Sequence, residues 1–167
     1  MKKIGVISDT HSCWDYRFLK YFKECDEIWH AGDIGNISIA KQLENICQLR
    51  AVSGNIDSGE TKIKYPDIQI FNVENLNVLI THIGGYPSKY SPGIKEMIKK
   101  NKIDIFISGH SHILKIMYDK ELNLLHINPG AAGKYGWQSK RTIVRFEINS
   151  GDNENNQIQN LEVIEFS

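Results

Sequence analysis

The feature that most constrains the fold is a series of short apolar runs, each of which stops abruptly at polar residues. The first three runs are residues 3–8, 27–31 and 48–53, and helical patterns lie between them at 14–23 and 38–46. Short β-branched runs are typical of buried strands, whereas apolar residues spaced three to four apart indicate one face of a helix. The order strand, helix, strand, helix, strand predicts a parallel sheet with right-handed crossovers.

The middle of the chain predicts a hairpin, a helix and a further buried strand. Runs at 68–73 and 77–81 are separated by Glu74, Asn75 and Leu76, a spacing that suits a hairpin turn and makes the sheet mixed. Ser91 and Pro92 then provide a capping hydroxyl and a first-turn proline for a helix that runs to about Lys100. A buried strand at 103–108 follows.

The last third of the chain predicts strands without helices. Alternating patterns occur at 115–120, 124–128, 142–148 and 158–166, and the polar stretch 151–157 reads as an exposed hairpin loop. We therefore expect a second, largely antiparallel sheet packed on the first, with the helices outside. The length of 167 residues suits one domain, so the expected architecture is a single α/β domain spanning residues 1–167.

Composition and charge exclude several classes of protein. The chain is 41% hydrophobic and 24% charged, as expected for a soluble globular protein, and its formal net charge of +0 disfavours stable complexes with nucleic acids. No apolar run approaches the roughly 20 residues that span a bilayer, and no signal-peptide core follows Lys2 and Lys3. The three cysteines suggest no disulfide framework, so we expect a cytoplasmic protein with no membrane partner.

Seven side chains that can bind metal ions lie just beyond the ends of predicted strands. They are Asp9, His11, Asp33, Asn55, His82, His110 and His112. In α/β sheets, ligands bind where the loops after the strands converge on a rigid scaffold. Each residue alone is weak support, because a single histidine is more often packed or exposed than a ligand. The ordered set predicts one site at one edge of the fold.

The order and spacing of these residues resemble those of calcineurin-like metallophosphoesterases. The resemblance covers nearly the whole chain and is carried by five segments, DTH at 9–11, GD at 32–33, GN at 54–55, TH at 81–82 and GHSH at 109–112. The short chain is most similar to the small bacterial and archaeal phosphodiesterases of that family. This resemblance implies a four-layer α/β/β/α sandwich and two divalent metal ions.

The resemblance also implies how the seven side chains divide between the two ions. Metal one would be held by Asp9, His11, Asp33 and His112, and metal two by Asp33, Asn55, His82 and His110. Nitrogen and oxygen ligands without a thiolate suit Mn²⁺, our first choice, or Ni²⁺, Fe, Co²⁺ or Zn²⁺. Two ions would activate a bridging hydroxide for in-line attack on a small phosphate ester, with His82, Asn55 and His110 as the candidate catalytic residues.

One position departs from the family pattern. Many members have a histidine directly after Gly-Asn, where this chain has Ile56, followed by Asp57. Isoleucine cannot donate a proton to a leaving group, a contribution that is often worth roughly 10² to 10⁴ in rate. The sequence therefore favours a phosphodiesterase with good leaving groups over the alternative, a phosphomonoesterase. Asp57 itself could orient a metal ligand or only bond within a turn.

A second alternative is a non-catalytic scaffold, because the retromer subunit that resembles this family binds proteins instead. All seven metal-capable positions are present here, and a scaffold gives no physical reason to cluster such charge. His30 and His126 lie within predicted strands, so we expect His30 either to support a metal ligand from behind or to pack, and His126 to have a structural role. Self-association of the chain is left open.

Overall fold

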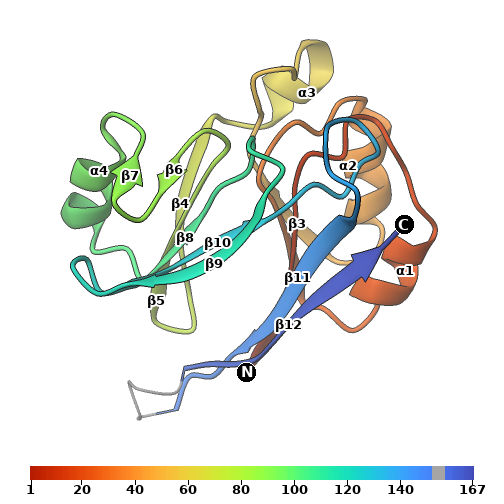
Figure 1. Cartoon of the computed structure of the whole chain (residues 1–167). Coiled ribbons are helices and arrows are strands. Elements are labelled where there is room, and N and C mark those ends of the chain that lie inside the picture. Colours follow the sequence, from red (N-terminus) through yellow and green to blue (C-terminus); the bar gives the residue numbers. More distant parts are fainter. Residues whose placement is uncertain (152–156) are drawn as a thin grey trace.

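The computed structural model describes residues 1–151 and 157–167. The predicted loop at 151–157 falls mainly on residues 152–156, which lie outside the described residues. Two five-stranded sheets form the centre of the fold, and helices cover both outer faces. Figure 1 shows α1 and α2 on one side of the sheets and α4 on the opposite side.

The first sheet contains the three parallel strands predicted from the amino-terminal pattern. Its order is β12-β11-β1-β2-β3, where β1 is Lys2–Ile7, β2 Glu27–His30, β3 Gln48–Ala51, β11 Arg141–Ile148 and β12 Ile158–Phe166. Strand β1 pairs in parallel with β2, and β2 with β3, whereas β11 runs antiparallel to both β1 and β12. The carboxyl ends of β1, β2 and β3 therefore lie at one edge.

The second sheet is mixed. Its order is β4-β5-β8-β10-β9, where β4 is Ile68–Val73, β5 Leu76–Thr81, β8 Ile105–Ile107, β9 Leu114–Asp119 and β10 Leu124–Pro129. The central strands β5, β8 and β10 are parallel, and the outer strands β4 and β9 are antiparallel to their neighbours. The carboxyl ends of β5 and β8 consequently meet at one edge of this sheet too.

Three apolar clusters divide the molecule into four layers. The cluster between the sheets includes Val6 of β1 and Ile80 of β5. A second cluster packs α1 (Arg17–Phe22) and α2 (Ile37–Glu44) on the outer face of the first sheet, and a third packs α4 (Ile94–Asn101) on the second sheet. Both sheets bury two faces, which explains why their middle strands β1 and β8 consist mainly of apolar residues. The expected α/β/β/α sandwich is confirmed.

The assignment of strands to sheets differs from the sequence prediction. The last four strands were expected to share the second sheet, but β11 and β12 extend the first, and β4, β5 and β8 belong to the second. Strand β11 fills the open edge of β1, where Val144 faces the core between the sheets and Ile143 faces the helices. An apolar pattern identifies a strand but does not name its partner.

Two of the three predicted helix starts are also wrong. Helix α1 begins at Arg17 and not at residue 14, because the carboxylate of Asp15 accepts the Arg17 backbone N–H at 3.0 Å and fixes a turn before the helix. Helix α4 begins at Ile94, and Gly93, with φ 85°, holds the position before it. Ser91 contributes its backbone oxygen, which accepts the Ile94 N–H, and not a capping hydroxyl.

Three short elements escaped prediction. They are α3 (Gly59–Lys64) and the two-residue strands β6 (Gly85–Tyr86) and β7 (Lys89–Tyr90), which pair with each other. Elements this short contain too few residues to show a period. Helix α3 carries the chain from the loop after β3 to β4 (Figure 1).

Candidate metal centre

The carboxyl ends of the parallel strands bring the predicted site residues together. The backbone N–H of Asp9, after β1, donates to the Gly32 oxygen at 3.0 Å, and that of His11 donates to the Asp33 oxygen at 3.0 Å. The His110 N–H donates to Asp9 Oδ2 at 3.1 Å and thereby connects the second sheet to the first. Residues from five separate loops thus share one edge of the molecule.

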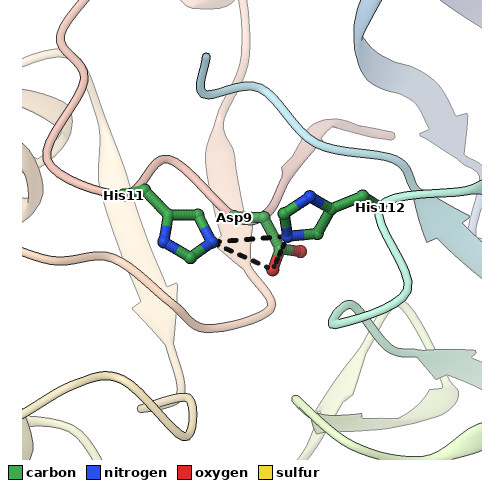
Figure 2. Close-up of side chains that lie close together, drawn as sticks. All are labelled: Asp9, His11 and His112. Carbon is green, nitrogen blue, oxygen red and sulfur yellow. Dashed lines mark hydrogen bonds and ion pairs between the residues drawn. The ribbon is translucent and has the colours of Figure 1, made fainter. Parts of the chain in front are cut away.

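The first cluster consists of Asp9, His11 and His112 (Figure 2). His112 Nε2 lies 3.1 Å from Asp9 Oδ1 and 3.3 Å from His11 Nε2, and His11 Nε2 lies 3.8 Å from the same carboxylate oxygen. Metal–ligand bonds of about 2.0–2.2 Å place the donor atoms around one ion roughly 3 to 4 Å apart. These three donor atoms have that spacing.

The second cluster consists of Asp33, His82 and His110. His82 Nε2 lies 3.2 Å from Asp33 Oδ2, and Asn55 Oδ1 lies 3.0 Å from His110 Nδ1. The same Asp33 oxygen is 3.6 Å from His11 Nε2 of the first cluster. Asp33 therefore stands between the clusters, and all seven predicted site residues lie together in the structure.

Hydrogen bonds on the far side of two histidine rings direct their lone pairs inward. A carbonyl oxygen only accepts, so His82 Nδ1, 2.7 Å from the Ala31 oxygen, carries a proton there when the ring is neutral and leaves a lone pair on Nε2. His112 Nδ1 donates to Gln138 Oε1 at 3.0 Å, because the Gln138 amide nitrogen is occupied by two backbone oxygens. Both free nitrogens face carboxylates.

Two buried atoms at the centre of the site are unsatisfied. Asp9 Oδ1 and His82 Nε2 have no hydrogen-bond partner with acceptable geometry among the described residues. Leaving such groups buried and unpaired typically costs about 1–3 kcal/mol each. Asp9 Oδ1 and the lone pair of neutral His82 lie 3.9 Å apart, so a proton or a metal ion between them would relieve their repulsion. The donor set therefore fits divalent metal ions.

The electrostatics of the site favour positive charge. Burial alone would raise the pKa of Asp9, but contacts with His11 and His112 hold it well below its usual range. Burial also opposes ionisation of Asp33, yet His82 and the Ile56 N–H lower its pKa. Burial would lower the pKa of His82, but the Asp33 carboxylate raises it, and Asp9 raises the pKa of His112. Both carboxylates are charged and attract cations.

The backbone at the site is strained. The residues Asp9, His11, Asp33, His110 and His112 all have positive φ, between 44° and 68°. This region costs a non-glycine residue on the order of 1–3 kcal/mol and persists where surrounding structure enforces it. Gly54 also has a local role, since a Cβ there would overlap the Asp33 carboxylate. The loops are shaped to hold side chains that point at one another.

Asp57 and Gln138 hold these loops in place. The sequence analysis left the role of Asp57 open and did not identify Gln138. Asp57 accepts backbone N–H groups from Gly54 at 2.7 Å, Ile34 at 3.1 Å and Gly35 at 2.8 Å, so it joins the loops that carry Asp33 and Asn55. Gln138 was missed, because a lone glutamine in a glycine-rich loop has no distinguishing pattern.

The site opens into a cleft of about 810 Å³. His11, Asp33, Asn55, His110 and His112 reach its surface, together with Ile56 and the segment 135–138. His30 and His126 are fully buried and lie away from this lining, as expected. His30 bonds to Thr10 Oγ1 at 3.0 Å and accepts the Gly32 N–H at 3.1 Å.

The longest helices in the part of the chain that the structure describes, α2 and α4, have eight residues each. No helix there has the length and apolar character to cross a bilayer.

Comparison with known proteins identifies the family. Residues 1–151 match the calcineurin-like phosphoesterase superfamily domain. A probable metallophosphoesterase from Methanothermobacter thermautotrophicus is 32% identical over 133 residues, which cover 77% of this chain and 76% of the relative. The chain belongs to the calcineurin-like phosphoesterase superfamily, whose members use divalent metal ions.

Two solved structures show the same fold. One, described as a novel archaeal phosphodiesterase, has a TM-score of 0.77 and 23% identity, with 98% of this chain and 99% of that chain covered. Chaetomium thermophilum Vps29 has a TM-score of 0.75 and 16% identity, with 99% and 94% covered. The predicted resemblance to calcineurin-like metallophosphoesterases is confirmed at the level of the family. At sequence identities of 16% and 23%, these two structures show a shared fold and not a shared activity.

Proposed function

We propose that this chain, as a single domain, is a phosphodiesterase that depends on two divalent metal ions and acts on a small phosphate ester. The observation that carries the proposal is the pair of donor clusters joined by Asp33, with Asp9 Oδ1 and His82 Nε2 buried and unsatisfied between them. Family membership supports hydrolysis of a phosphate ester.

The proposed ligand sets share Asp33. Metal one takes Asp9, His11, Asp33 and His112, and metal two takes Asp33, Asn55, His82 and His110. The distances from Asp33 Oδ2 to His11 Nε2 and His82 Nε2, 3.6 and 3.2 Å, support this sharing. Mn²⁺ is the first choice for both positions, and Ni²⁺, Fe, Co²⁺ and Zn²⁺ are compatible with the same nitrogen and oxygen donors.

Two divalent ions would supply an activated water nucleophile and stabilise charge on the phosphate oxygens. The protein itself would position the side chains that meet the ester and the metal ions. His110 and Asn55 lie exposed at the cleft, where they can meet the ester, and His82 is held from behind by the Ala31 carbonyl. Asp57 keeps the loops of Asp33 and Asn55 at a fixed separation.

The cleft favours a substrate with one negative charge. No lysine or arginine is among the described residues that line it, and Ile56 occupies the surface where a proton donor would stand in many relatives. A monoester carries up to two charges and often needs its leaving group protonated, whereas an activated diester needs neither extra cation nor acid. The diester is therefore the better match.

The test is an assay of metal-stripped protein on bis-p-nitrophenyl phosphate beside p-nitrophenyl phosphate, before and after addition of Mn²⁺. Metal-dependent hydrolysis that favours the diester is expected. A preference for the monoester would transfer the proposal to phosphomonoesterase. No turnover with Mn²⁺, Ni²⁺, Co²⁺ or Zn²⁺ would contradict an enzyme for such esters and favour the scaffold reading.

A further inference from the structure

Four large apolar side chains surround the mouth of the cleft. They are Ile56, Ile113, Tyr135 and Trp137, here called the apolar wall, with exposed fractions of 45%, 62%, 70% and 103%. Single exposed apolar residues are common on protein surfaces. A group of them around a concave, charged site indicates a surface that binds a ligand or a partner molecule.

The aromatic half of the wall is tied to the metal centre. Gln138 donates to the backbone oxygens of Tyr135 at 2.7 Å and Gly133 at 3.2 Å, while its Oε1 accepts from His112 at 3.0 Å. The Tyr135 ring lies 4.9 Å from the His11 ring, centre to centre. The loop is thus positioned by two residues of the first cluster, and a ligand held there would reach the aromatic rings.

The cleft is large for a phosphate and lacks further cationic groups. Its volume of about 810 Å³ lies in the range that accommodates a molecule of drug size. The absence of lysine and arginine among the described lining residues leaves a second phosphate group without a counter-charge. The cleft therefore suits a substrate whose remainder is uncharged, and the wall offers apolar and aromatic surface to contact it.

We propose that the apolar wall selects phosphodiesters that carry a planar aromatic ring next to the phosphate, with the ring packed against Trp137 and Tyr135. The proposal rests on the proposed function for the place of the phosphate. Aromatic rings gain roughly 0.5–1.5 kcal/mol from such packing beyond the area they bury, which corresponds to a 2- to 12-fold preference. A nucleobase and a simple aryl group share this chemistry.

The test compares binding of two non-hydrolysable monoanions to the Mn²⁺-loaded protein by isothermal titration calorimetry. Benzyl(methyl)phosphinate presents an aromatic ring, and (cyclohexylmethyl)(methyl)phosphinate presents a saturated ring of similar size at the same charge. We expect the benzyl compound to bind roughly 2- to 12-fold more tightly. A third compound, with thymine in place of phenyl, separates the two sources, because tighter binding than benzyl assigns a nucleobase.

Substitutions in the apolar wall test whether the wall causes the preference for the aromatic ring. Trp137→Leu and Tyr135→Leu are each expected to bring the benzyl-to-cyclohexylmethyl ratio toward one. Tyr16→Leu is the matched control, because Tyr16 is 80% exposed and lies outside the cleft lining, and it should keep the wild-type ratio. Equal binding of both rings to the wild type, or a ratio unchanged in both wall variants, would overturn the inference and leave the wall as a surface for a macromolecule.

The binding ratio is independent of turnover, so the two proposals can fail separately. A protein that hydrolyses diesters but binds both rings equally contradicts only the inference. A protein that shows the aromatic preference but hydrolyses no ester contradicts only the proposed function.

Discussion

The six histidines of this chain fall into two groups that differ in what surrounds the ring. His11, His82, His110 and His112 lie at the strand ends, each grouped with a carboxylate. His30 and His126 are fully buried within strands β2 and β10, where burial lowers their pKa values to about 4. The same residue type thus serves as a candidate metal ligand at the strand ends and as a neutral, buried structural residue within the strands.

The difference teaches that position in the sheet sets the role. A residue within a strand faces a core, as His126 does beside Phe106 at 5.1 Å between ring centres. A residue just past a strand end can take a left-handed conformation and turn toward neighbouring loops, as His110 and His112 do. At the strand ends, neighbouring carboxylates raise the pKa values of His82 and His112. In the interior, burial lowers the pKa values of His30 and His126.

Replacing the shared carboxylate should break the strand-end group most severely. Asp33→Asn keeps the shape but removes the negative charge between the clusters, so both metal ions should be lost. We expect diester hydrolysis to fall by more than about 100-fold, since even partners of metal ligands cost 10- to 100-fold. The stoichiometry of bound Mn²⁺ and the initial rate of diester hydrolysis measure these two effects.

Asp67→Asn is the matched control, because Asp67 carries an exposed carboxylate that bonds to Ser53. Retention of two ions in Asp33→Asn would contradict the sharing of Asp33 between the two metal ions.

Asn55→Ala should divide the two clusters. Its side-chain oxygen lies 3.0 Å from His110 Nδ1 in the second cluster, so metal two should weaken while metal one stays bound. Calorimetric titration with Mn²⁺ should show the stoichiometry falling from two toward one. Asn72→Ala, which removes an exposed bond to Asn77, is the control. Equal weakening of both ions would count against the assignment.

Gln138→Ala should loosen one strand-end histidine without removing a ligand. The ring of His112 would lose the acceptor that holds its Nδ1 proton, so the affinity for metal one should fall 10- to 100-fold. Competition titration against a chelator gives that affinity. Gln42→Ala, on α2, removes only a bond to the Ser38 oxygen and should change nothing. An unchanged affinity in Gln138→Ala would show that packing alone orients His112.

The buried histidine His126 should make the free energy of unfolding depend on pH in the acid range. A histidine whose pKa is lowered to about 4 binds fewer protons folded than unfolded, so its contribution to stability is lost as pH falls from 6.5 toward 4. His126→Phe removes this term. Between pH 7 and pH 5 the wild type should lose about 2 kcal/mol more unfolding free energy than the variant, in urea titrations with a chelator. Parallel losses would mean that His126 is protonated without penalty.

Much of this fold could be predicted because its strands are apolar and short. The parallel order of β1, β2 and β3 followed from alternation with helices, and the turn before β5 from Glu74 and Asn75, both of which have positive φ. The start of α4 could not be predicted, since Gly93 and a backbone bond to Ser91 replace a side-chain cap. Elements such as α3 are fixed by their surroundings and not by a repeating pattern.

The sequence by itself determined the family and the residues that meet at the strand ends, because ligand types and their order along the chain are local properties. Tertiary structure alone decided that β11 joins β1, that Gln138 holds His112, and that Tyr135 and Trp137 stand over the cleft. The physical reason is that these contacts join residues far apart in the chain, or depend on directions that only packed loops impose.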